Sequence, residues 1–144
     1  MHLACDRQGR PLSVVVTPGQ WHESTQVAAV LDGIRVPRPG GRPRKRPAHL
    51  IADKGYSCPA CRQLLSRRGI RHTIPERRDQ RQRRATHPGR PLAFDAAIYR
   101  RRNVIERCVN RLKQWRGIAT RYEKRAVNYR AMVIIAALVI WLTS

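Results

Sequence analysis

Residues 99–113 run Tyr-Arg-Arg-Arg-Asn-Val-Ile-Glu-Arg-Cys-Val-Asn-Arg-Leu-Lys, and this stretch is the most informative in the chain. Tyr99, Arg102, Glu106 and Lys113 follow one another at steps of three, four and seven residues. Because an α-helix turns about 100° per residue, these four side chains fall within a sector of roughly 60° on one helix face. The spacing therefore places one carboxylate beside two permanent cations and a phenol.

A second acid lies at the end of an apolar segment. We predict a strand over 49–52, a helix from about 57 to 68 and a strand over 70–75, which together form a βαβ unit. Asp53 then lies at the carboxyl edge of a parallel pair, where ligands collect. Carboxylates from separate elements are what two-metal phosphodiester chemistry requires, with Mg²⁺ or Mn²⁺ as the cations.

Simpler interpretations stand beside this one. Arg102 and Glu106 are four residues apart, as in many solvated ion pairs on helices. An acid before a glycine, as at Asp53, is often only a turn former. Asp6 is expected to be a turn residue, and Asp95 is expected to cap the helix that runs from about residue 96 to 115.

The charge favours a polyanionic partner. Lys and Arg number 30 against 9 Asp and Glu in 144 residues, which gives a net charge of +21. Such a field suits nucleic acid, here double-stranded DNA, and predicts steep salt dependence. Two basic loops are expected at about 36–47 and 76–90. An anionic membrane surface is the competing explanation for the charge, but it leaves the spacing of residues 99–113 unexplained.

The apolar segments predict no membrane span. The longest apolar run, 131–142, is too short to cross a bilayer and predicts a helix over about 128–143 that is buried on most sides. No signal peptide opens the chain, so we expect a cytoplasmic protein. Cys58 and Cys61 have metal-like spacing, but the other two cysteines are single, which favours reduced thiols over a zinc site.

Residues near the amino terminus predict a β-hairpin followed by a helix. The hairpin pairs 2–5 with 12–17 around a glycine-containing turn, and the helix runs over about 23–31.

These motifs resemble a known family, the bacterial insertion-sequence transposases with a DDE triad of the type usually called IS-five. That family carries Tyr-x2-Arg-x3-Glu-x6-Lys on its last catalytic helix, and all four positions are matched here. It also carries an Asp-x-Gly-Tyr-like turn after a strand, matched by Asp53, Gly55 and Tyr56.

The resemblance implies an RNase H-like fold, a five-stranded mixed sheet flanked by helices. It implies Mg²⁺-dependent hydrolysis at transposon ends and then attack of the freed 3′-hydroxyl on target DNA. Asp53 would be the second acid of the triad and Glu106 the third, both holding metal. Tyr99, Arg102 and Lys113 would contact the DNA.

The chain also departs from the family pattern. The first acid belongs on a strand that precedes the opening hairpin, and that strand is the central one of the sheet. We therefore predict that residues 1–144 form a partial catalytic domain without this strand or an amino-terminal DNA-recognition region. Its partners would be an upstream transposase segment or further copies of the chain, and alone it would be inactive. The alternative is a non-catalytic basic DNA-binding protein that modulates transposition.

Overall fold

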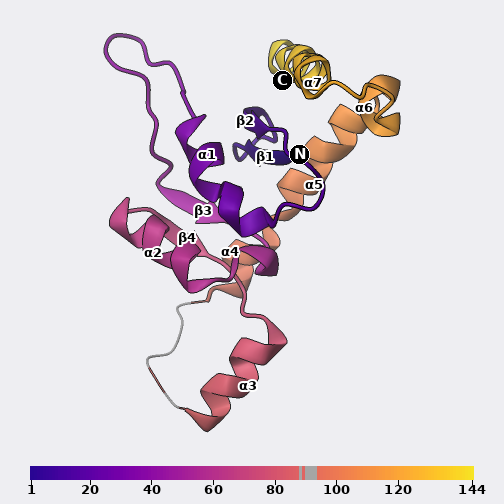
Figure 1. Ribbon diagram of the computed structural model, residues 1–144. Helices are drawn as coiled ribbons and strands as arrows, with labels where there is room; N and C mark the ends of the chain where they lie inside the picture. Colours follow the sequence, from indigo (N-terminus) through magenta and orange to yellow (C-terminus); the bar gives the residue numbers. More distant parts are fainter. Residues whose placement is uncertain (88, 90–93) are drawn as a thin grey trace.

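The computed structural model describes residues 1–87, 89 and 94–144, so the predicted loop over 76–90 falls partly outside the described residues, at 88 and 90. Its elements are arranged as Figure 1 shows. In chain order they are β1 (His2–Cys5), β2 (Pro11–Val15), η1 (Glu23–Gln26), α1 (Val27–Asp32), β3 (His49–Ile51), η2 (Lys54–Tyr56), α2 (Pro59–Arg67), β4 (Arg71–Thr73), α3 (Arg78–Thr86), α4 (Ala96–Arg100), α5 (Asn103–Lys113), α6 (Arg116–Thr120) and α7 (Ala126–Leu142).

The predicted hairpin is confirmed, with β1 and β2 antiparallel. Asp6 closes the turn, because its Oδ1 accepts hydrogen bonds from the backbone N–H groups of Gln8 and Arg10, both at 2.9 Å. Gly9 lies at φ +82°, a conformation that favours glycine. A polar turn of this kind ends one strand and starts the next without leaving backbone donors unpaired.

The predicted βαβ unit is also confirmed, since β3 and β4 are parallel with His49 opposite Arg71. Pro59 opens α2 at a position where its missing N–H costs nothing. Gly69 ends the helix at φ +62°. The N–H of Gly69 donates to Ser66 O and that of Ile70 to Leu65 O, both at 2.9 Å, which is a Schellman arrangement.

The hairpin lies between two helical layers (Figure 1), in contact with α1 on one side and with α5 and α7 on the other. Alternate side chains of a strand point to opposite faces, so each face of the hairpin contributes to a different core. The first core is formed by Val27, Leu31, Ile34, Cys61, Leu65, Ile70 and Ile74. The second is formed by Cys108, Leu112, Ile118, Tyr129, Val133, Ala136 and Ile140.

The α/β class is confirmed, but the described residues form no single mixed sheet. The hairpin and the β3–β4 pair are separate two-stranded sheets. Each of the four strands therefore has one edge without a neighbouring strand among the described residues. Within the same residues, no helix is long and apolar enough to cross a membrane.

Three helix predictions need correction. The segment expected as a loop at 76–90 contains α3, because arginine and glutamine are good helix formers even without an apolar face. The helix expected over 96–115 is two helices, α4 and α5, with bonds at the junction that reach three residues back instead of four. The helix expected over 23–31 begins with the 3₁₀ turn η1.

The prediction that the last helix is buried on most sides is wrong for the described residues. Tyr129, Val133, Ala136 and Ile140 pack into the second core. The opposite face leaves Ile134, Ile135, Leu138 and Leu142 between 50% and 76% exposed. An apolar run shows which residues could be buried, whereas burial depends on which elements lie beside the helix.

Candidate active site

Asp53 is positioned by the end of β3. The strand pairing continues one residue past Ile51, where Ala52 N–H donates to Thr73 O at 3.3 Å. Asp53 then turns the chain into η2, and its Oδ1 accepts a hydrogen bond from Lys54 N–H at 2.5 Å. The carboxylate is half-buried. The carboxyl edge of the parallel pair therefore carries this acid, as the sequence predicted.

Arg102 lies at the junction of α4 and α5, between Tyr99 and Glu106. Its guanidinium lies over the Tyr99 ring, 5.7 Å from the ring centre. Residues three apart eclipse in a tightened 3₁₀ turn, which is why the break between the helices stacks these two side chains. Arg102 also donates a hydrogen bond to Glu106 Oε1 at 2.5 Å. The simple ion pair expected for residues four apart is thus present.

Arg102 is bonded to Glu106 and also lies within the electrostatic range of Asp53. Partial burial acts to lower the pKa of Arg102, but Tyr99, the hydrogen bond to Glu106 and the Asp53 carboxylate outweigh it and raise that pKa. Asp53 and Glu106 are 53 residues apart in sequence, and the fold brings the field of both to one guanidinium. Glu106 is the more exposed partner, with 54% of its side chain accessible.

Lys113 is farther from this group. It is the last residue of α5, seven residues beyond Glu106, which corresponds to about 10 Å along the helix. Its side chain is exposed and makes no ion pair within the described part of the chain. The structure therefore places Tyr99, Arg102 and Glu106 in contact, brings Asp53 within the electrostatic range of Arg102, and leaves Lys113 at the distant end of α5.

Glu23 is an acid near this site that the sequence analysis did not single out. A Cβ added to Gly55 would lie only 2.9 Å from Glu23 Oε2, so the carboxylate lies directly over the turn that follows Asp53. Burial, Glu23, Cys61 and Asp53 together raise the pKa of Tyr56 to about 12. Sequence spacing gave no signal for this neighbour, because contact between η1 and η2 creates it.

The carboxylates of Asp53 and Glu106 have the oxygen ligands that a hard cation prefers, but two acids are fewer than a metal site normally needs. Both supply carboxylate oxygens from separate elements, as Mg²⁺ and Mn²⁺ prefer. In the ranges that the structure describes, no group of three His, Cys, Asp or Glu side chains could hold a metal ion.

The cysteines do not form a zinc site in those ranges. Cys58 Sγ instead accepts the Cys61 N–H at 3.4 Å at the start of α2. All four cysteines are free thiols.

This chain belongs to the DDE transposases: the sequence model of the family described as "Transposase DDE domain" matches residues 1–142. Members of this family cleave DNA and use divalent metal ions. The chain is similar to a protein of Brucella ovis named as a transposase for insertion sequence element IS6501, with 29% identity over 142 residues, 99% of this chain and 96% of that protein.

A second relative, from Burkholderia cepacia, is named as a transposase for insertion sequence element IS402. The two are 28% identical over 144 residues, which cover 99% of this chain and 62% of that protein. No solved structure matches the chain. The family assignment therefore rests on sequence, and the resemblance drawn from residues 99–113 to an insertion-sequence DDE transposase is confirmed.

Proposed function

We propose that this chain is part of the catalytic domain of an insertion-sequence transposase that cleaves transposon ends and joins them to target DNA. Asp53 and Glu106 are the acids that hold Mg²⁺ or Mn²⁺. The observation that carries this proposal is Arg102, which is hydrogen-bonded to Glu106 and lies in the field of Asp53. The membership of this chain in the DDE transposase family supports the same reaction.

The residues of the site have separate roles in this proposal. When bound, the metal ions activate the attacking oxygen and stabilise the leaving oxygen of the phosphodiester. Arg102 holds the Glu106 carboxylate through its hydrogen bond before DNA arrives and then turns to a phosphate beside the scissile bond. Tyr99 stacks on a base or donates a hydrogen bond to a phosphate. Lys113 binds a phosphate farther along the duplex.

We also propose that the remaining acid, the first of the triad, comes from a strand lying between β1 and β3. The two separate two-stranded sheets support this, because a strand placed there would join them into one mixed RNase H-like sheet. Its source would be an upstream transposase segment or another copy of the chain. Without that acid the chain binds DNA but does not cleave it, and full activity returns only when the strand is supplied.

The test is a titration of the purified chain with Mn²⁺, followed by electron paramagnetic resonance of the free ion. Asp53→Asn and Glu106→Gln should each weaken Mn²⁺ binding by roughly tenfold or more. Asp79→Asn is the matched control, because Asp79 is an exposed acid on α3. If all three variants bind Mn²⁺ as the native chain does, the metal site is refuted and the non-catalytic DNA-binding function is favoured.

A further inference from the structure

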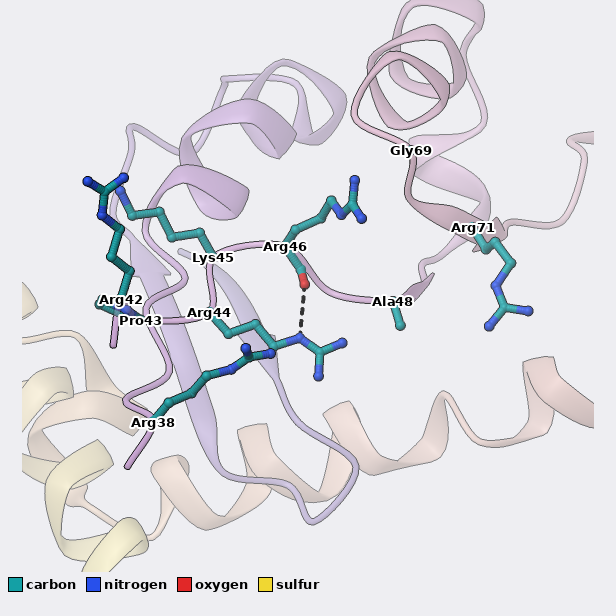
Figure 2. Close-up of a pocket in the computed structure, with 9 residues that line it drawn as sticks. All are labelled: Arg38, Arg42, Pro43, Arg44, Lys45, Arg46, Ala48, Gly69 and Arg71. Carbon is teal, nitrogen blue, oxygen red and sulfur yellow. Dashed lines mark hydrogen bonds between the residues drawn. The ribbon is translucent and has the colours of Figure 1, made fainter. Parts of the chain in front are cut away.

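The strongest unassigned feature is a hollow of about 890 Å³ on the surface, which we call the basic cleft. Figure 2 shows it between the segment 36–48 and the start of β4. Its lining consists of Arg38, Arg42, Pro43, Arg44, Lys45, Arg46, Ala48, Gly69 and Arg71. Six of these nine residues are permanent cations, and none is an acid.

The segment that forms one wall of the cleft has a defined shape. Val36 and Arg44 pair as an antiparallel bridge. The backbone N of Val36 lies 2.9 Å from Arg44 O, and the backbone N of Arg44 lies 2.8 Å from Val36 O. Between them Gly40 and Gly41 turn the chain at φ +74° and +95°. The segment is therefore a closed arm.

The floor of the cleft depends on Gly69. Arg46 donates a hydrogen bond to Arg68 O at 3.4 Å, at the C-terminus of α2. A Cβ at Gly69 would lie 3.2 Å from Arg46 Nη1, so a larger residue there would push this guanidinium by a few tenths of an ångström. Arg44 Nε donates to Arg46 O at 3.2 Å (Figure 2). Two of the six cations are thus held by the protein backbone.

Among the residues that the structure describes, the charges of the cleft have no counter-ions. All six cations are exposed. The ion pairs among the described residues use other arginines, at positions 10, 68, 77, 84 and 102. Like charges gathered in this way repel one another, and a bound polyanion would relieve that repulsion.

The cleft and the acids lie at opposite ends of the β3–β4 pair. Ala48 precedes β3 and Arg71 begins β4, whereas Asp53 follows the other end of β3. Five residues of extended chain span about 16 Å, which corresponds to roughly five base pairs of duplex at 3.4 Å each. DNA held in the cleft therefore contacts the protein well away from the bond beside the acids.

We propose that the basic cleft is a second DNA-binding site, which holds the sugar–phosphate backbone of duplex DNA without reading its sequence. It shares a ligand class with the proposed function but rests on different residues and a different edge of the fold. Guanidinium groups pair with phosphate oxygens through two parallel hydrogen bonds, and five of the six cations are arginines. Backbone contacts of this kind position DNA and carry no sequence information.

The test uses fluorescence anisotropy of a labelled, random-sequence duplex across a NaCl series. The triple variant Arg38→Gln, Arg42→Gln, Lys45→Gln changes only exposed side chains for which the structure shows no hydrogen bonds. If each binds one phosphate, the slope of log K against log [NaCl] should become shallower by about 2 to 3.

The matched control removes the same charge from α3, through Arg78→Gln, Arg81→Gln and Arg83→Gln. These side chains are also exposed, but they lie on a convex helix. The control should change the slope by less than about 1. Equal changes in the two triple variants would overturn the proposal, because they would indicate diffuse attraction without a site.

Two further readouts separate this proposal from its alternatives. Unchanged DNA binding by the cleft variant, combined with lost binding to vesicles rich in phosphatidylserine, would refute a DNA site in favour of a membrane surface. The cleft variant should keep the Mn²⁺ affinity of the native chain, and Asp53→Asn should keep the native salt slope. A failed metal titration would therefore not refute the DNA-binding site in the cleft. An unchanged salt slope would not refute the metal-binding role of the two acids.

Discussion

Replacing Ile140 with alanine should destabilise the protein far more than the same change at Ile135, although both lie in the apolar run of α7. Ile140 is 4% exposed and packs in the second core, whereas Ile135 is 56% exposed. Deleting the equivalent of three methylene groups from a fully buried site costs about 2.4 kcal/mol in transfer free energy. The residual cavity adds on the order of 1 kcal/mol.

Alanine has a higher helix propensity than isoleucine, which stabilises the folded state by about 0.4 kcal/mol at either position. Ile140→Ala should therefore lower the unfolding free energy by about 3 kcal/mol. At Ile135 a little under half of the transfer term applies and no cavity forms, so the loss should be about 0.7 kcal/mol.

Urea unfolding followed by circular dichroism at 222 nm measures both losses, and an unchanged denaturant slope serves as the control. Equal losses at the two positions would refute the reasoning, because they would mean that the outer face of α7 is covered in solution.

Three further changes test other parts of the structure. Gly69→Ala should cost about 1 kcal/mol or more in thermal unfolding, since φ is +62° there and the new Cβ crowds the neighbouring guanidinium. A variant as stable as the native chain would contradict that geometry. Burial lowers the pKa of both His2 and His49 below 6.5. The contribution of these two histidines to the unfolding free energy should therefore be complete above pH 6.5 and should fall as the pH drops from 6.5 to the lowered values. The fall should disappear in the His2→Gln, His49→Gln double variant, and its persistence would assign it to other groups. Trp141→Phe removes the 2.7 Å hydrogen bond from Nε1 to a β2 carbonyl together with one of the two fused rings of the indole, so it should cost at least about 1 kcal/mol in the same urea assay. No loss would mean that water replaces this bond.

Local patterns were sufficient to predict the hairpin and the βαβ unit. Gly9 sets the turn of the hairpin, and Pro59 and Gly69 mark the two ends of α2. These signals act within a few residues of the chain, so they do not depend on how the domain packs. The spacing of Tyr99, Arg102 and Glu106 is also a local signal. It placed three side chains of the candidate site on one face.

Segments without an apolar pattern were predicted less well. In α3 the arginines form a helix with no buried face, so hydrophobic periodicity gives no signal there. Intrinsic propensity and a hydrogen bond from Arg77 N–H to Gln80 Oε1, at 3.1 Å, support that helix instead. The break between α4 and α5 is equally local in geometry. The helical spacing of side chains continues across it, so the sequence pattern does not reveal the break.

The sequence alone determined the family, the basic charge, the helix face that carries Glu106 and the strand end that carries Asp53. Only the tertiary structure brought Asp53 within the electrostatic range of Arg102, placed Glu23 over Gly55 and gathered six cations into the basic cleft. It also decided that one face of α7 is buried and the other is not. The physical reason is that secondary structure follows from interactions between near neighbours, whereas burial and charge clustering depend on contacts between residues far apart in the chain.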